Sequence, residues 1–156
     1  KQDTIIIAPE ELFTKLLKKG YKRENIITIE PGEKHSIEGI NFETIPAYNV
    51  NKQFHPKENG WVGYIIELKG IRYYITGDTD ITAENRKVKC DVIFVPVGGT
   101  YTMNFEEASQ LVNEIRPKVA VPIHYGSIVG TKQDAVRFTE LVDSEIKCEI
   151  LMKEND

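Results

Sequence analysis

Short apolar runs separated by turn residues dominate the hydrophobic pattern of this 156-residue chain. The runs 61–68 and 71–76 meet across Lys69-Gly70, which predicts a tight β-hairpin. Residues 40–48 alternate in part between apolar and polar side chains and predict a strand that follows the turn 36–39 of a second hairpin. Further strands are predicted from the runs 4–8, 25–30, 91–97, 119–124 and 146–152, and the continuous run 91–97 predicts burial on both faces.

Helical periodicity predicts three helices between these strands. Asn104, with Glu107 three residues later, forms a capping-box pattern before the stretch 105–116, and Thr131 with Asp134 does the same before 132–144. The first helix is expected to start with Pro9 in its first turn and to stop at Gly20. Strands and hairpins therefore fill the first half, and strands alternate with helices in the second half. This order predicts an α/β fold with a mixed sheet, as one domain over residues 1–156.

Composition and charge limit the classes of protein to which the chain belongs. Apolar residues make up 40% and charged residues 28% of the sequence, which is typical of a globular chain with a core and excludes a disordered one. The apolar runs are too short to cross a membrane. The net charge of −4 and the lack of a basic stripe argue against a nucleic-acid partner, and therefore against a nuclease. Cys90 and Cys148 have no CxxC spacing, so we expect reduced thiols and a cytoplasmic location.

Candidate chemistry is concentrated where three predicted strands end. One strand ends at Gly77-Asp78-Thr79-Asp80, a second at Gly98-Gly99-Thr100-Tyr101, and a third at His124-Tyr125-Gly126. Ligands of open α/β sheets bind at the carboxyl ends of strands, where loops converge on a rigid platform. The glycines allow the backbone to approach a ligand or to turn tightly. The sequence therefore predicts a site at one edge of the sheet.

Asp78 and His124 are the strongest candidates for metal ligands. A carboxylate and an imidazole at neighbouring strand ends both suit zinc, manganese or iron, and a carboxylate also bridges two ions in hydrolytic sites. The alternative for Asp78 is a turn-capping carboxylate, and the alternative for His124 is a half-buried histidine with a hydrogen-bond partner.

His55 is the third candidate, because its polar loop 49–60 leaves a predicted strand and is able to fold over the same edge. Asn49 competes with it for that position, although an amide is a poor zinc ligand. His35 is expected on the surface of a hairpin. Tyr101 is expected either to pack at the edge of the core or to donate a hydrogen bond to an oxyanion.

The order of four motifs resembles the carboxyl-terminal part of metallo-β-lactamase-superfamily hydrolases, in the branch of metal-dependent hydrolases related to ascorbate-6-phosphate lactonase. The motifs are TIPAYNVNKQFHPKENGWVGYII, YYITGDTD, FVPVGGTYTMNFEEA and PKVAVPIHYG. The resemblance implies an αββα sandwich, a small-molecule substrate and a dinuclear zinc or manganese site at the sheet edge. It also implies that Asp78 matches the bridging aspartate and His124 the last histidine ligand.

The chain departs from that family in one motif. The signature His-x-His-x-Asp-His is absent, and the chain begins with KQDTIIIAPEEL, which in the family follows shortly after it. The fold is therefore expected to lack its amino-terminal strands. Asn49 stands where the family has an imidazole, a place that His55 is able to fill.

Two functions follow from this departure. In the first, the chain is the carboxyl-terminal part of a hydrolase that cuts an ester, lactone or phosphoester bond. The chain alone would then bind metal weakly or not at all and be inactive, because a catalytic zinc needs three protein ligands. In the second, the chain is a non-catalytic assembly or binding module. Either way, uncovered apolar surface favours a homo-oligomer or pairing with the missing amino-terminal segment.

Overall fold

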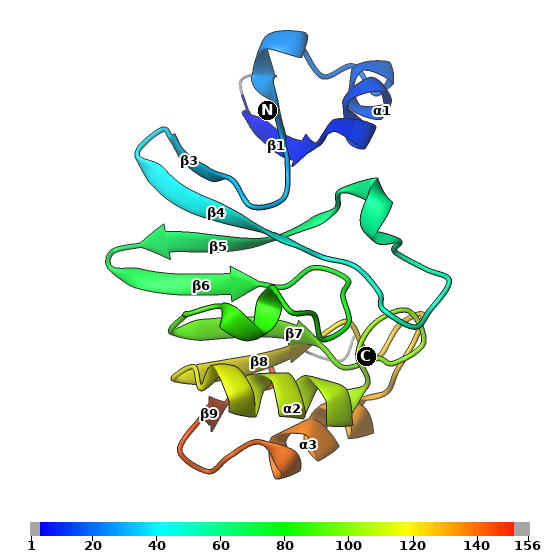
Figure 1. Cartoon of the computed structure of the whole chain (residues 1–156), viewed down its shortest axis with the longest axis vertical. Coiled ribbons are helices and arrows are strands. Elements are labelled where there is room, and N and C mark those ends of the chain that lie inside the picture. Colours follow the sequence, from blue (N-terminus) through cyan, green and yellow to red (C-terminus); the bar gives the residue numbers. More distant parts are fainter. Residues whose placement is uncertain (1–3, 152–156) are drawn as a thin grey trace.

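A seven-stranded mixed sheet forms the centre of the computed structural model, which describes residues 4–151 (Figure 1). Its strands follow one another across the sheet in chain order, from β3 to β9. The pairs from β3 to β6 are antiparallel, and the pairs from β6 to β9 are parallel. The bounds are β3 (Lys34–Ile37), β4 (Ile40–Pro46), β5 (Val62–Leu68), β6 (Ile71–Ile75), β7 (Val92–Pro96), β8 (Val119–Ile123) and β9 (Lys147–Cys148).

Both predicted hairpins are confirmed, with two-residue turns. Glu38-Gly39 joins β3 to β4, and Lys69-Gly70 joins β5 to β6. All four turn residues have positive φ, between 52° and 77°. Turns of this kind match the right-handed twist of the flanking strands, which is why a short Xaa-Gly pair between two β-rich runs is informative.

A small amino-terminal unit stands beyond β3 and β4 (Figure 1). Strands β1 (Ile6–Pro9) and β2 (Ile26–Ile29) pair in parallel, joined by η1 (Glu10–Leu12), α1 (Phe13–Lys18) and η2 (Arg23–Asn25). The predicted first helix is thus shorter than expected. None of its residues is buried, and its contacts are mainly with η1 and β2 of the same small unit. Gly20, at φ +88°, ends the helix as predicted.

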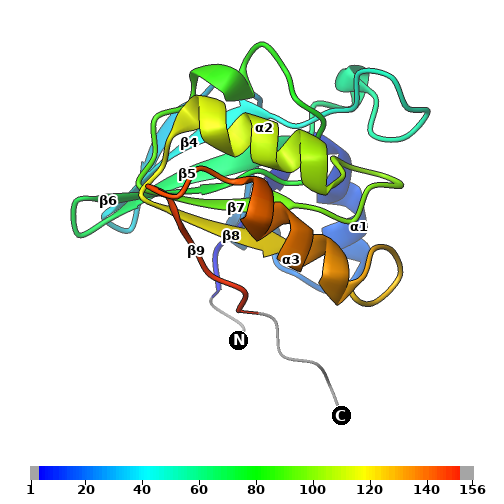
Figure 2. The ribbon, with the colours of Figure 1, turned by 90° about the horizontal axis from the view of Figure 1, so that it is seen from below.

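Two amphipathic helices cover one face of the sheet (Figure 2). They are α2 (Phe105–Ile115) and α3 (Lys132–Leu141), and both carry the predicted capping box. Asn104 accepts a hydrogen bond from the Glu107 N–H at 2.8 Å while the Glu107 carboxylate accepts one from the Asn104 N–H at 2.9 Å. The short helices η3 (Lys57–Asn59) and η4 (Asn85–Lys87) lie in loops.

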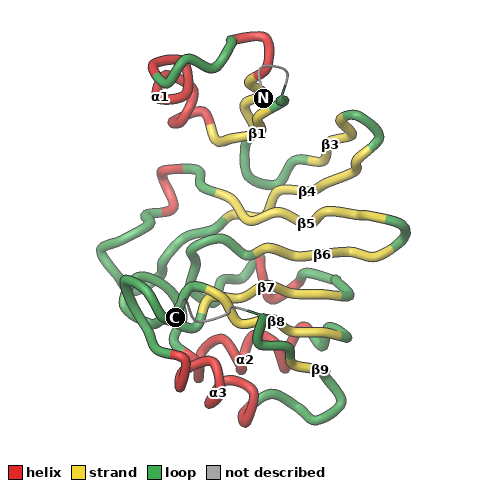
Figure 3. The backbone as a smooth tube through the Cα atoms, turned by 180° about the vertical axis from the view of Figure 1, so that it is seen from behind, coloured by secondary structure: helices red, strands yellow, loops and turns green. Residues whose placement is uncertain are grey.

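The opposite face of the sheet is only partly covered. On β7, Ile93 and Val95 face the helices and are fully buried, whereas Val92 and Phe94 on the other side are half-buried. The predicted burial of this strand therefore holds for one face. Ile71 and Ile75 of β6 are 40% and 37% exposed. Figure 3 shows the strands in front of both helices in the view from behind.

The last predicted strand is much shorter than expected. Strand β9 contains only Lys147–Cys148, because the parallel pairing with β8 ends after these two residues. Met152, at the end of that prediction, lies outside the described residues, as does the start of the chain at Lys1.

Both cysteines are free thiols that pack partly buried against the main core. Burial raises the pKa of the Cys90 thiol to about 12, so it stays protonated near neutrality. In the range 4–151, no helix has the length and apolarity needed to cross a membrane.

Candidate metal centre

Four strands end at the edge of the sheet where the site was predicted. Strands β6, β7 and β8 are parallel to one another, and β4 runs in the same direction because it is two antiparallel steps from β6. The loops that follow these four strands gather at the right-hand end of the sheet in Figure 1. They carry His55, Asp78, Tyr101 and His124, so residues far apart in the sequence meet there.

Asp78 lies between two imidazoles. Its Oδ2 is 3.3 Å from Nε2 of His55, and its Oδ1 is 3.5 Å from Nε2 of His124. The side chains of Asp78 and His124 are 40% and 35% exposed, whereas that of His55 is 17% exposed. All three predicted site residues are therefore brought together, and each carboxylate oxygen faces a different histidine.

The strands that carry Asp78 and His124 are not direct neighbours, in contrast to the expectation of adjacent strand ends. Strand β7 lies between β6 and β8, so their axes are about 10 Å apart at ordinary strand spacing. Gly98, after β7, makes the close approach possible. A Cβ at this position would overlap the backbone carbonyl oxygen of His124. The absence of a side chain on Gly98 thus lets the backbone of His124 pack against the end of β7.

Both histidines have left-handed backbones, with φ of +49° for His55 and +59° for His124. This conformation is uncommon for residues other than glycine and costs on the order of 1–3 kcal/mol. The surrounding structure must hold it in place. Such strain is concentrated at active sites and ligand sites, so it supports a functional role for both histidines.

The ring of His55 is held in place by contacts on the side away from Asp78. Its Nδ1 is 3.1 Å from the carbonyl oxygen of Tyr101, which accepts the hydrogen bond of an Nδ1–H tautomer. The lone pair of Nε2 is then free on the side that faces Asp78. The ring of Trp61 packs against His55 edge-on, with centroids 5.2 Å apart. A histidine fixed in this way by a carbonyl is typical of metal ligands.

Asn49 supports His55 and does not replace it. The Asn49 N–H donates a hydrogen bond to the carbonyl of His55 at 2.9 Å, and its Nδ2 donates to the carbonyl of Tyr101 at 2.8 Å. Asn49 is 7% exposed, and within the described residues its Oδ1 has no hydrogen-bond partner. Of the two competing residues, it is thus the imidazole of His55 that meets Asp78.

The two carboxylates of the Gly77–Asp80 turn have different surroundings. Asp80 is buried, pairs with Lys52 and accepts a hydrogen bond from the Val50 N–H at 2.9 Å. Thr79, fully buried, donates to the carbonyl of Tyr48 at 3.1 Å. These contacts tie the loop of His55 to the end of β6. Asp78 therefore faces the site, whereas Asp80 anchors the loop.

A second cluster fixes the same loop farther out. Glu84 accepts hydrogen bonds from Tyr48 and Lys57, each at 2.8 Å, and the Lys57 ammonium lies 4.6 Å from the centre of the Tyr48 ring. The hydrogen bonds from Lys57 and Tyr48 lower the pKa of Glu84 to about 2. The sequence does not predict this cluster or the role of Lys52, because no local pattern marks residues that meet across more than 25 positions.

The structure adds contacts to the predictions for His35 and Tyr101. His35 is not a freely exposed residue, since it stacks on Phe42 at 4.9 Å and pairs with Glu33 at 3.0 Å. Tyr101 is half-buried, and its ring packs edge-on against Phe54 at 4.7 Å. Trp61 is not among the predicted site residues, although it is the single tryptophan of the chain and closely follows the His55 loop. Its nearness to this loop in the sequence is the signal that could have indicated its contact with His55.

The three side chains fit part of a dinuclear metal site. Nitrogen and oxygen ligands of a tetrahedral ion with bonds of about 2.1 Å lie about 3.4 Å apart. Both separations from Asp78 match this spacing. Across residues 4–151, however, no three His, Cys, Asp or Glu side chains are grouped so that they could hold one ion. The arrangement suits a carboxylate shared by two ions with one histidine each, and it leaves further ligand positions to be filled.

Comparison with known proteins finds relatives whose names describe metal-dependent hydrolases. Residues 3–124 match a family model described as Beta-lactamase superfamily domain. A UPF0173 metal-dependent hydrolase of Staphylococcus aureus is 32% identical over 132 residues, which cover 77% of this chain and 57% of that protein. The chain thus spans little more than half the length of such relatives.

Solved structures show the same fold. A protein from Parabacteroides distasonis, whose name contains the words metal-dependent hydrolase, is 32% identical with a TM-score of 0.81. The match covers 96% of this chain and 65% of that one. Igni18, a metallo hydrolase from the archaeon Ignicoccus hospitalis, is 25% identical with a TM-score of 0.75, over 94% of this chain and 65% of its own. The predicted α/β fold class is confirmed, and the chain belongs to the metallo-β-lactamase superfamily.

Proposed function

We propose that the full-length protein is a metal-dependent hydrolase in which Asp78 bridges two ions, His55 binds one and His124 the other. One observation carries this proposal: the two oxygens of a single carboxylate each face a different imidazole, at 3.3 and 3.5 Å. An ordinary salt bridge needs only one such contact. The names of the relatives, which describe metal-dependent hydrolases, support the same reaction class.

The residues of the chain would position the ions and the substrate. His55 presents Nε2 because Tyr101 holds the opposite ring nitrogen, and Asp78 keeps the two ion positions adjacent. Zinc or manganese at these positions would supply Lewis-acid polarisation of the scissile bond and a water of lowered pKa. The bond we propose is an ester, lactone or phosphoester bond. Its hydrolysis adds the hydroxyl of one water to the acyl or phosphoryl centre and gives the proton to the departing oxygen.

We propose that the remaining metal ligands come from the residues that the longer relatives have in addition to the part that matches this chain. The chain spans 57% of the S. aureus relative, and its three candidate ligands leave each ion with one histidine and one shared carboxylate. A catalytic zinc has three protein ligands and one open position. By this argument the 156 residues alone bind metal weakly and have little or no activity.

The test uses variants of the full-length protein that remove the ligands but keep the backbone. Asparagine tolerates the left-handed conformation, so His55→Asn and His124→Asn lose the imidazole without forcing a change of φ. Asp78→Ala removes the bridge. His35→Asn is the matched control, since His35 lies on β3 and contacts Phe42 and Glu33.

The expected results are a loss of bound metal and a fall of at least about 100-fold in kcat/KM for the three site variants, as for loss of a ligand or of its support. The control should keep both. Metal content by inductively coupled plasma mass spectrometry and turnover of ester, lactone and phosphoester substrates measure these effects. Unchanged metal content and turnover in Asp78→Ala would refute the assignment. A full-length protein that binds no metal would instead favour the assembly module.

We further propose that the apolar face of the sheet is covered in the full-length protein by the residues that longer relatives have in addition. A groove on this side is lined mostly by aliphatic and aromatic side chains, among them Ile7, Phe42, Tyr64 and Ile66. Continuous exposed apolar surface usually belongs to an interface.

The free, partly buried cysteines support our proposal of a cytoplasmic location.

A further inference from the structure

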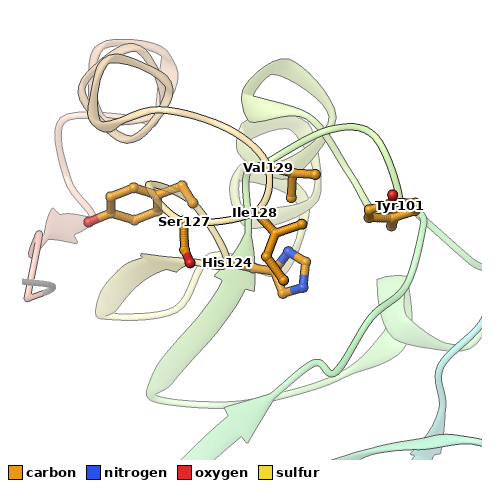
Figure 4. Close-up of a pocket in the computed structure, with 6 residues that line it drawn as sticks. Tyr101, His124, Ser127, Ile128 and Val129 are labelled. Carbon is orange, nitrogen blue, oxygen red and sulfur yellow. The ribbon is translucent and has the colours of Figure 1, made fainter.

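A pocket of about 260 Å³ opens directly beside the imidazole of His124 (Figure 4). Ile128 and Val129 lie on one side of it and Tyr101 on the other. An apolar cavity of about 150 Å³ holds a benzene molecule, so this volume has room for one ring or a short alkyl chain. The lining residues are Tyr101, His124, Tyr125, Ser127, Ile128 and Val129.

Ile128 is 88% exposed, although it is a large aliphatic residue. A single exposed isoleucine is not unusual by itself. Its position is informative because it belongs to the same pocket as a candidate metal ligand. An apolar group bound there would remove both its own surface and that of Ile128 from water, which is favourable.

The loop that carries Ile128 is held at both ends. The Gly126 N–H donates a hydrogen bond to the carbonyl of Gly130 at 3.2 Å, and both glycines have positive φ. Gly130 packs so closely on Gly98 that a Cβ would meet the Cα of Gly98. The tip 127–129 is therefore presented from a fixed base beside β7.

Tyr101 connects this pocket to the metal centre. Its carbonyl oxygen accepts the hydrogen bond from His55 at 3.1 Å, and its ring rests against Phe54. The same residue thus orients one candidate ligand and forms one wall of the pocket next to the other. A group bound in the pocket would lie immediately beside the bond that is cut.

We infer that this pocket receives the apolar part of the substrate's acyl group, a short alkyl chain or an aromatic ring. The inference rests on the proposed hydrolase function and assigns substrate selection to Ile128 and Val129. Acyl groups with more methylenes, up to the size of the pocket, should react faster because each buried methylene contributes to binding in the transition state.

The first test compares esters of one alcohol with acetyl, butyryl and hexanoyl groups, using the full-length protein with metal. We expect kcat/KM to rise about three- to fourfold per added methylene. Ile128→Ser and Val129→Thr should reduce this dependence, so that kcat/KM falls more for the hexanoyl ester than for the acetyl ester. Leu141→Ser is the control, since Leu141 is another exposed aliphatic residue, at the end of α3 and outside the pocket. Equal chain-length dependence in Ile128→Ser and wild type would overturn the inference.

The second test needs no turnover and separates the pocket from the proposed function. The neutral probes hexanamide and acetamide are titrated into the metal-free protein, and amide chemical shifts are followed by NMR. Hexanamide should shift the signals of Tyr101, Ile128 and Val129 more strongly than acetamide, and Ile128→Ser should weaken this response. Such a response in a protein without any hydrolytic activity would refute the proposed function but support the pocket. Hydrolysis of the esters with no preference between the two probes or among the esters would support the proposed function but refute the pocket.

Discussion

At the residue scale, Tyr74 shows how a buried polar atom limits stability. Its side chain is completely buried in the main core, and within the described residues its hydroxyl has no hydrogen-bond partner. Burial raises the pKa of Tyr74 above its usual range, which reflects the same lack of solvation. A buried hydroxyl without a partner costs about 1–3 kcal/mol.

Tyr74→Phe should therefore increase the free energy of unfolding by about 1 kcal/mol, because it removes the hydroxyl and keeps the ring. Tyr48→Phe is the matched control and should lower it by about 1 kcal/mol, since the Tyr48 hydroxyl donates to Glu84. Urea denaturation of both variants measures these values. A Tyr74→Phe variant less stable than wild type would show that the hydroxyl has a partner in solution.

At the scale of elements, the local signals were sufficient for most of the fold. The hairpin turns at Glu38-Gly39 and Lys69-Gly70 and the capping boxes at Asn104 and Thr131 were all predicted, because each depends on residues within a few positions. The first helix and the last strand were predicted too long. Their lengths depend on whether another element packs against them, and the local pattern does not contain this information.

The candidate site was predicted in part for the same reason. Their strand ends identify Asp78 and His124 in the sequence, and its polar loop identifies His55. The contacts by which Asn49 and the carbonyl of Tyr101 support His55 have no such local signal. A carbonyl group is present in every residue, so the sequence does not distinguish the one that holds a ring in place.

The end of β7 gives a prediction about the link between strand packing and the site. In Gly98→Ala, the added Cβ would overlap the carbonyl oxygen of His124 and displace the backbone that carries this imidazole. We expect a loss of about 3 kcal/mol in stability and weaker metal binding. Gly126→Ala is the control. Its Cβ would meet nothing within 4 Å, so only the positive φ of +77° is unfavourable, at about 1 kcal/mol. Thermal unfolding and metal titration compare the two, and equal effects would contradict the overlap argument.

The loop cluster around Glu84 gives a prediction about pH. The folded-state pKa of about 2 lies below the ordinary value of 4.5, so Glu84 stabilises the fold fully above pH 4.5. This contribution decreases as the pH falls and is lost once the pH passes through about 2. Glu84→Gln should therefore be less stable than wild type at neutral pH, and the difference should shrink with acidification. Denaturation between neutral and acidic pH measures it, with Glu140→Gln on α3 as an exposed control. A difference independent of pH would show that the charge of Glu84 is not involved.

At the scale of the whole molecule, the two faces of the sheet differ in how well they are covered. The face under α2 and α3 contains most of the completely buried residues, whereas the other face exposes Ile40, Leu68, Ile71 and Ile75 by 37–45%. Continuous apolar strands such as β7 are typical of sheets covered on both sides. This pattern supports the proposed cover, and the β1–β2 unit packs on part of this face, where Ile29 contacts the cluster of Phe42 and Val62.

Ile75→Lys in the full-length protein decides whether that cover exists. If further residues of the protein pack on this face, the new ammonium becomes buried without a partner and the loss in stability should exceed about 3 kcal/mol. An open face would tolerate the lysine with a change below about 0.5 kcal/mol. Leu141→Lys on α3, where the side chain is 48% exposed, should show only this small effect. Denaturation at several protein concentrations identifies the cover, because packing by a second copy would make the loss depend on concentration, whereas packing within one chain would not.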